Sequence, residues 1–271
     1  KIGNYIAKSL SVGDLFMAAI VPGLILVFLY GLYFVFSLKK EVLTVDENQK
    51  HENFFKLIST LIPPFFLIFA VLGSIITGIA SPTEAAGIGA LGAIIIALIH
   101  KKLNLKILKE STTQSAFISS MVFLILIGAS IFSLVFRGLG GEELITEIFN
   151  AIPGGLFGSM LLVMLLVFVL GFILDFIEIT FIVVPIVGPI LMAMGADPLW
   201  LGVMLAINLQ TSFLTPPFGF ALFYLRSVTP ETISTESMYK GVFPFILIQI
   251  LVLCLVAYFP FLATLLPELI F

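Results

Sequence analysis

Residues Asn208 to Gly219 read Asn-Leu-Gln-Thr-Ser-Phe-Leu-Thr-Pro-Pro-Phe-Gly. This stretch interrupts an apolar run that extends from Leu199 to Leu225. Pro216 and Pro217 lack backbone donors, so a helix that enters this stretch is expected to break there. The sequence therefore predicts two short helices separated by a polar, irregular segment.

The composition places this broken helix in a lipid bilayer. Of the 271 residues, 60% are hydrophobic and 11% are charged, and the mean hydropathy is +1.22. A soluble domain is roughly 45–50% apolar and about 25% charged, so a water-soluble enzyme is excluded. The net charge of −3, with no basic run carrying interleaved aromatic residues, indicates no nucleic-acid partner.

Apolar segments near the length that spans a bilayer as a helix, about 20 residues, recur along the chain. They predict an all-α, polytopic transmembrane protein. The stretch from Glu142 to Ile152 mixes polar and apolar residues and predicts a helix at the membrane interface. The expected spans are Leu15–Leu38, Leu57–Ala80, Thr83–Ile99, Ser115–Phe136 and Val242–Leu266.

Ten of the thirteen lysines and arginines fall in three loops, which the positive-inside rule places in the cytoplasm. The segment from Gly138 to Gly154, and both ends of the chain, are then expected outside. The loop residues are Lys39, Lys40, Lys50 and Lys56, then Lys101, Lys102, Lys106 and Lys109, then Arg226 and Lys240.

Between the outer loop and the broken helix, the sequence predicts a re-entrant hairpin with its tip near residues 174–179. Its first arm is Leu156–Leu174, and its second, Ile179–Met194, is short and contains two prolines. That second arm is expected to be too short and too interrupted to cross the bilayer. Hairpins and broken helices are the elements that secondary transporters place around substrate and ion sites.

Asp175 and Glu178 lie at the expected tip. Carboxylates at membrane depth are costly and indicate function by default. The alternative is that the tip reaches headgroup water and both residues only mark the membrane boundary.

The break itself is rich in oxygen ligands. The hydroxyls of Thr211, Ser212 and Thr215, with carbonyls freed by the prolines, suit a hard monovalent cation because no carboxylate cage is present. A half-helix that begins near Phe218 would aim its positive end at an anion. The alternative is a proline kink whose hydroxyls are satisfied within the helix.

A third polar cluster, Ser81-Pro82-Thr83-Glu84, is expected to be a turn between two helices. Ser81 or Thr83 can cap the following helix, and Glu84 suits its first turn. The same hydroxyls and carbonyls are also candidates to line a site.

These clusters resemble a known family. GIASPTEAAGIGA, LGFILDFIEITFIVVPI and NLQTSFLTPPFGFALFYLR, with SVGDLFMAAIVPGLILVFLYGLY nearer the start, are similar to the large membrane subunit of tripartite ATP-independent periplasmic (TRAP) transporters. The resemblance covers nearly the whole chain and is closest to the mannitol or chloroaromatic branch. It implies the C-terminal portion of an inverted-repeat transporter, with the hairpin and break of the second repeat.

The resemblance also implies partners and a coupling ion. Such transporters use sodium as coupling ion, without an organic cofactor, and import mostly carboxylates across the bacterial inner membrane. They work with a small membrane subunit and a periplasmic substrate-binding protein, and here an N-terminal half of the large subunit, on the same or a separate chain, is expected.

Carried residue by residue, the resemblance places the hairpin tip at Gly171–Thr180 and the helix break at Asn208–Gly219. The candidate substrate residues are Asp175, Glu178, Thr180, Asn208, Gln210 and Phe218. The candidate sodium residues are Gly171, Asn208, Thr211, Ser212, Thr215 and Gly219.

The predicted division is 1–153 for scaffold and connecting helices, 154–226 for the hairpin and broken helix of the transport unit, and 227–271 for a C-terminal transmembrane helix. No common catalytic motif is present in the sequence, which predicts a transporter and not an enzyme. Two alternatives stay open: a membrane enzyme that uses Asp175 and Glu178 as acid and base, and a structural membrane subunit.

Overall fold

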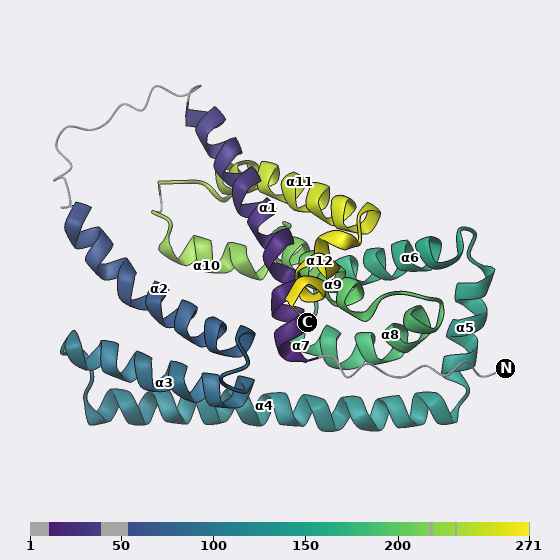
Figure 1. Ribbon diagram of the computed structural model, residues 1–271, viewed down its shortest axis with the longest axis horizontal. Helices are drawn as coiled ribbons and strands as arrows, with labels where there is room; N and C mark the ends of the chain where they lie inside the picture. The colour runs from purple at the N-terminus through teal and green to yellow at the C-terminus, as the bar shows by residue number, and fades with distance from the viewer. Residues whose placement is uncertain (1–10, 39–53, 217–218, 231, 271) are drawn as a thin grey trace. The chain divides into compact units, whose positions relative to one another are not determined.

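In the computed structural model, which describes residues 11–38, 54–216, 219–230 and 232–270, every regular element is helical (Figure 1). The predicted all-α class is confirmed. The elements are α1 (Val12–Leu38), α2 (Phe54–Ile76), α3 (Pro82–Ile99), α4 (Leu105–Gly138), α5 (Gly141–Ala151), α6 (Gly155–Leu170), α7 (Phe176–Glu178), a π-helical turn η1 (Ile179–Val183), α8 (Val184–Ala193), α9 (Pro198–Leu214), α10 (Phe220–Val228), α11 (Thr235–Tyr258) and α12 (Phe261–Ile270).

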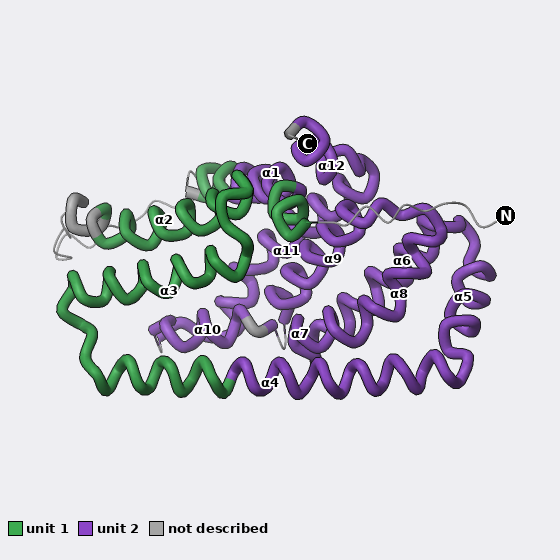
Figure 2. The backbone as a smooth tube through the Cα atoms, turned by 60° about the horizontal axis from the view of Figure 1, so that its bottom comes forward, with its two compact units in different colours: residues 1–17, 31–117 green, residues 18–30, 118–271 purple. Residues whose placement is uncertain are grey.

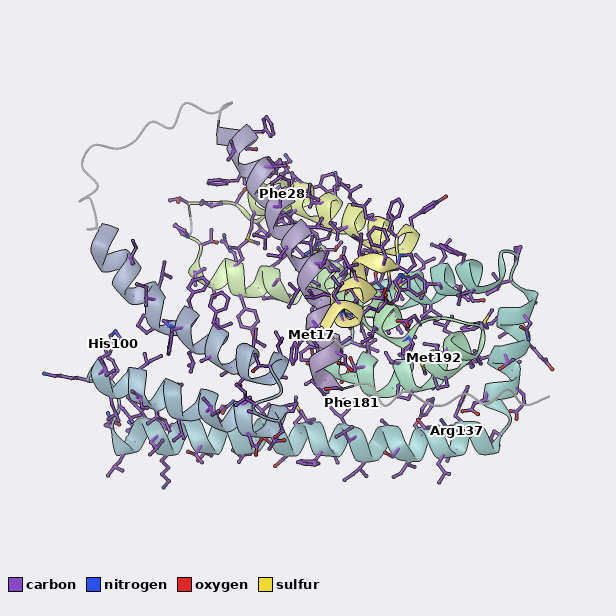
Figure 3. The ribbon with its side chains drawn as sticks, in the orientation of Figure 1. Met17, Phe28, His100, Arg137, Phe181 and Met192 are labelled. Carbon is purple, nitrogen blue, oxygen red and sulfur yellow. The ribbon has the colours of Figure 1, made fainter. Side chains whose placement is uncertain are left out.

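Several of these helices suit a bilayer. Five in the described ranges are long and apolar enough to cross a membrane, and a sixth crossing results if α5 and α6, bent by 117° at their junction, form one span. Large apolar side chains such as Phe28 on α1 point outward (Figure 3). Lipid tails are as apolar as these side chains, so their exposure is expected where lipid is the solvent.

The chain forms two compact units, coloured separately in Figure 2. Unit 1 comprises residues 1–17 and 31–117, and unit 2 comprises residues 18–30 and 118–271. In unit 1, α2 and α3 pack as a pair. Gly89 lies opposite Val71 and Gly92 opposite Leu67, and a side chain at Gly92 would collide with Leu67. Small residues thus let the two backbones approach closely.

Unit 2 is built around α9. This helix contacts α6, α10, α11 and α12, and its buried side chains form the centre of the main apolar core. Trp200 on α9 is buried and its Nε1 donates a hydrogen bond of 2.8 Å to the carbonyl oxygen of Val256 on α11. A buried indole N–H needs such a partner, so this bond fixes α11 along α9.

Two expected boundaries differ from the structure. Helix α4 begins at Leu105, ten residues before the expected span, because the Asn104 side chain accepts a bond of 2.8 Å from the Ile107 amide and starts the helix there. Lys106 and Lys109 therefore lie on a helix and not in a loop. The last segment is two helices, α11 and α12, because Pro260 disfavours helical backbone at Phe259.

Candidate cation and substrate site

The chain between α6 and α9 folds back on itself as a hairpin. Helix α6 leads into a turn at residues 171–175, and α7, η1 and α8 then return along α6, which contacts both η1 and α8. The return arm is continuous from Phe176 to Ala193 and is long enough to count as a span. The expectation that its prolines interrupt it was wrong. Pro185 directly follows the π-helical turn η1 and Pro189 lies within α8, and the backbone stays helical through both.

The tip of the hairpin packs directly on the last turn of α9. A Cβ added to Gly171 would collide with the Ser212 hydroxyl oxygen and would lie 2.7 Å from Ser212 Cβ. The rings of Phe176 and Phe213 meet edge to face, with their centroids 6.2 Å apart. The structure thus brings together the two regions that the sequence singled out separately.

Asn208 connects the two elements by a hydrogen bond. Its Nδ2 donates to the Met164 carbonyl oxygen on α6 at 2.8 Å, and its side chain is 2% exposed. A buried amide is costly unless it is paired, so this bond holds α6 against α9 one turn below the hydroxyl cluster. No sequence signal pointed to Met164, which lies in a uniformly apolar helix.

Three hydroxyls occupy the end of α9. The hydroxyls of Thr211, Ser212 and Thr215 donate at 2.7–2.8 Å to the carbonyls of Ile207, Leu209 and Thr211, respectively. Thr211 and Ser212 are fully buried, whereas Thr215 is partly buried. Each proton points back into the helix, so each hydroxyl oxygen keeps lone pairs that a cation or a donor can use.

The break follows at once. Thr215 leaves helical geometry with φ −87° and ψ 126°, and α10 begins only at Phe220. A Cβ at Gly219 would collide with the Phe213 carbonyl oxygen and lie 3.0 Å from that of Thr215. Gly219 therefore lets two carbonyl oxygens approach the backbone beside the hydroxyl cluster. Phe218, a candidate substrate residue, lies outside the described residues.

The acidic residues lie at the start of the return arm. Asp175 and Glu178 are half-buried, and Asp175 precedes α7 as its cap, accepting a bond of 2.7 Å from the Phe176 amide. Thr180 lies one turn further, exposed, within the π-helical turn. The carboxylates are thus at the tip that packs on α9, and their role in substrate binding stays a prediction.

The other predicted residues differ from this cluster, either because the side chain is exposed or because the residue belongs to unit 1. Gln210 on α9 is exposed, unlike its neighbours Asn208 and Thr211. In unit 1, Ser81 and Glu84 form a capping box: the Ser81 hydroxyl accepts from the Glu84 amide at 3.4 Å, and Glu84 Oε2 accepts from the Ser81 amide at 2.8 Å. Pro82 and Thr83 occupy the first helical turn of α3. The capped turn is confirmed, and its lining of a site stays a prediction.

The ligands available for a cation are neutral oxygens. Within the described parts of the chain, no three His, Cys, Asp or Glu side chains come together as a metal site. The cluster at the end of α9 instead offers hydroxyl and carbonyl oxygens. Such hard oxygen ligands suit alkali and alkaline-earth cations and not zinc or copper.

Comparison with known proteins identifies the family. Residues 3–262 match the model of the tripartite ATP-independent periplasmic transporter, DctM component. The chain therefore belongs to this family of membrane transport proteins, as its sequence motifs suggested.

Named relatives agree with this assignment. The chain is 29% identical to the sialic acid TRAP transporter large permease protein SiaM of Vibrio cholerae, over 97% of the chain and 62% of that protein. It is also 29% identical to the C4-dicarboxylate TRAP transporter large permease protein DctM of Rhodobacter capsulatus, over 97% and 60%. An uncharacterized protein of Salmonella typhimurium, YgiK, is 29% identical over 96% of the chain and 59% of its own length. The chain thus spans about three-fifths of the length of these relatives.

Proposed function

We propose that this chain carries part of the transport machinery of a sodium-coupled importer of organic acids, supplied by a soluble binding protein. The observation that carries the proposal is the packing of the hairpin tip on the broken helix, at Gly171 against Ser212. Hairpins and broken helices in contact are the elements from which secondary transporters build a transport site. In this proposal the two elements act together and bind both the coupling ion and the substrate.

The chemistry of the cluster favours a monovalent cation. The buried hydroxyls of α9 already donate their protons within the helix, and two carbonyl oxygens approach Gly219 beside them. Together they offer several neutral oxygens in a small volume. Such a set favours a small hard cation in a low-dielectric setting, and it lacks the carboxylates with which proteins bind Ca²⁺. Sodium is the ion that we assign to Gly171, Asn208, Thr211, Ser212, Thr215 and Gly219.

The charge pattern supports coupling to an anion. From Gly138 to Leu225 the sequence contains acidic residues and no lysine or arginine. An anionic substrate that approaches the tip meets the charges of Asp175 and Glu178, so a bound cation lowers the cost of its entry. By thermodynamic reciprocity, the substrate then raises the affinity for the cation to the same extent.

Organic acids are the proposed substrates because SiaM and DctM are named for sialic acid and C4-dicarboxylates. We further propose that the protein lies in the bacterial inner membrane. Its partners are a small membrane subunit, a periplasmic substrate-binding protein and the remaining part of a large permease. The division into scaffold (1–153), hairpin with broken helix (154–226) and C-terminal segment (227–271) belongs to the same proposal.

Uptake by reconstituted vesicles tests this function. The complete permease, with its small subunit and loaded binding protein, should accumulate labelled sialic acid or succinate when a sodium gradient points inward. It should fail to do so with an equal potassium gradient. Chemical conversion of the substrate without accumulation would favour the membrane enzyme, and neither accumulation nor conversion would favour a structural subunit.

A further inference from the structure

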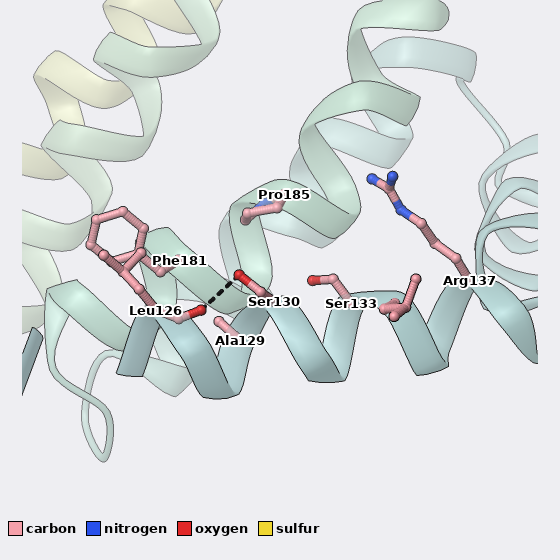
Figure 4. Close-up of a pocket in the computed structure, with 8 residues that line it drawn as sticks. Leu126, Ala129, Ser130, Ser133, Arg137, Phe181 and Pro185 are labelled. Carbon is pink, nitrogen blue, oxygen red and sulfur yellow. Dashed lines mark hydrogen bonds between the residues drawn. The ribbon is translucent and has the colours of Figure 1, made fainter. Parts of the chain in front are cut away.

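A cavity in unit 2 lies beside the hairpin, on its return arm and away from the hydroxyl cluster. It is formed between α4 and the segment η1–α8, and its volume is about 380 Å³, near the lower end of the range for small-molecule sites. Figure 4 shows its lining. The lining residues are Leu126, Ala129, Ser130, Ser133, Leu134 and Arg137 from α4, with Phe181 and Pro185 from the return arm.

The cavity has one cationic end. Arg137 lies at the end of α4, and Figure 4 shows the tip of its guanidinium turned toward the return arm. Its Nε donates to Glu142 Oε1 at 2.7 Å. Within the described residues, the two Nη nitrogens make no other ion pair or hydrogen bond. The outer edge of the guanidinium, formed by the two Nη nitrogens, thus remains available for a two-pronged contact with a carboxylate.

Two hydroxyls continue the polar line from Arg137. Ser133 and Ser130 lie four and seven residues earlier on α4, roughly 6 and 10 Å along the helix axis, and so on the same face. The Ser130 hydroxyl donates to the Leu126 carbonyl at 2.8 Å, whereas the Ser133 hydroxyl has no partner in the described part of the chain. Both hydroxyl oxygens can accept a bond, and that of Ser133 can also donate one.

The opposite end of the cavity is apolar. Phe181 and Leu126 lie together in Figure 4, away from Arg137, and Pro185 covers the middle. Figure 3 likewise places Arg137 and Phe181 well apart along α4. The cavity therefore matches a molecule with an anionic head, a hydroxyl or carbonyl near its middle and an apolar tail.

The other cations of unit 2 do not offer this arrangement. Nη1 of Arg226 donates to the Ile233 carbonyl oxygen, and Lys240 pairs with Glu236 on the same exposed helical turn. Arg137 is also the last basic residue before Arg226 in the sequence. An anion that moves toward the hairpin therefore meets Arg137, a cation that lines a cavity and keeps its two Nη nitrogens unpaired in the described structure.

We infer that this cavity is a binding site for the carboxylate of a small organic acid, held by the Nη edge of Arg137 and by Ser133. We further infer that this acid is the transported substrate and binds here before it reaches the hairpin tip; only this second step rests on the proposed function. Glu142 then acts as a competitor for the same guanidinium, since it already occupies the Nε side. Removing Glu142 should strengthen the site and removing Arg137 should weaken it.

Thiol labelling tests the site without knowledge of the substrate. In the full chain in lipid nanodiscs, Cys254→Ser removes the single, exposed cysteine, and Ser133→Cys places a thiol in the cavity. The rate of reaction with anionic methanethiosulfonate ethylsulfonate is divided by the rate with its cationic trimethylammonium analogue. Arg137→Gln should lower this ratio about tenfold or more, because a unit charge roughly 6 Å away is removed.

Glu142→Gln should raise the same ratio, a sign opposite to that of Arg137→Gln. If the ion pair between Arg137 and Glu142 only stabilised the fold, both variants would change the ratio of labelling rates in the same direction. Lys240→Gln is the matched control, because it also removes the cation of an exposed ion pair in unit 2, and it should leave the ratio unchanged. Arg137→Lys keeps the charge and should keep the ratio, so it serves if Arg137→Gln does not fold.

Protection tests the ligand class. 3-Phenyllactate at millimolar concentration should slow labelling of Leu134→Cys, a cavity-lining position that leaves Arg137 and Ser133 in place, and its uncharged amide should not. The protection should be lost in Arg137→Gln and reduced in Arg137→Lys, which cannot form the two-pronged contact. A ratio unchanged by Arg137→Gln, or equal labelling with and without the acid, would overturn the site. Neither result would refute the proposed function, because sodium-driven uptake is measured in a separate experiment.

Discussion

Gly171→Ala is the substitution that probes the contact between hairpin and broken helix most simply. The added methyl group would collide with the Ser212 hydroxyl and lie 2.7 Å from Ser212 Cβ. Rotating the hydroxyl relieves the first contact but does not move the Cβ. Because carbon atoms pack at about 3.5–4.0 Å, the tip and α9 must separate locally by roughly 1 Å.

A forced separation of this size is expected to lower stability by about 1–3 kcal/mol, the usual range for overpacking. Ser212→Gly removes both colliding atoms, so the double variant should recover part of the loss. The expected interaction energy is about 1–2 kcal/mol in favour of the pair, within the range for residues in contact. Gly188→Ala is the matched control, because its Cβ would meet only Val184 Cγ1 at an ordinary 3.7 Å on the other arm of the hairpin.

The assay is thermal unfolding in detergent, followed by the emission of Trp200. This is the only tryptophan in the chain, and it is buried in α9 with its indole bonded to α11. Gly171→Ala should unfold at a lower temperature than Gly188→Ala, and adding Ser212→Gly should raise it again. Equal midpoints for the two alanine variants would refute the packing of the tip on α9.

Three further predictions concern the ion, the acids and the orientation of the chain. The hydroxyls at the end of α9 are removed one at a time by Thr211→Val, Ser212→Ala and Thr215→Val. At least one of these variants should raise the sodium concentration for half-maximal uptake about tenfold, the effect of roughly 1.4 kcal/mol. Thr146→Val, which removes a similar intrahelical bond in α5, is the control and should leave this concentration unchanged. Asp175→Asn and Glu178→Gln should reduce uptake more than expression, and wild-type uptake by both would make them markers of the membrane boundary. A cysteine at residues 138–154 should react with an impermeant thiol reagent from the periplasmic side and one at residues 101–109 should not, and the reverse pattern would invert the topology.

The helices, turns and breaks of this fold could be predicted from the sequence, whereas the contacts between them could not. Apolar length and proline positions are local signals, so the hairpin arms, the break after Leu214 and the capped turn at Ser81 were all expected and are present. The continuity of the return arm was not predicted, because Pro185 and Pro189 suggested breaks. The π-helical turn η1 lies directly before Pro185, the backbone stays helical there, and the spacing of the prolines did not reveal this.

Packing partners could not be predicted for a different reason. Helix α6 is apolar on every side, so the pattern does not mark the face that meets α9, and the bond from Asn208 to Met164 was not foreseeable. Likewise, Arg137 directly precedes the segment Gly138–Gly154, and no sequence pattern pairs it with the return arm, since its cavity is formed with residues almost 50 positions away. Gln210 looked equivalent to Asn208 in sequence, yet one side chain is exposed and the other buried.

If the hairpin tip and the end of α9 together hold a sodium ion, sodium should stabilise the folded protein more than potassium does. The unfolding midpoint of the complete permease, followed by the loss of helical circular dichroism, is compared in sodium and potassium chloride of equal concentration. A ligand that binds only the folded state stabilises it, by about 2.7 kcal/mol at one hundred times its dissociation constant. We expect a higher midpoint in sodium, a difference that is lost in Gly171→Ala and reduced when the hydroxyls of α9 are removed. Equal midpoints in the two salts at saturating concentration would contradict the sodium site.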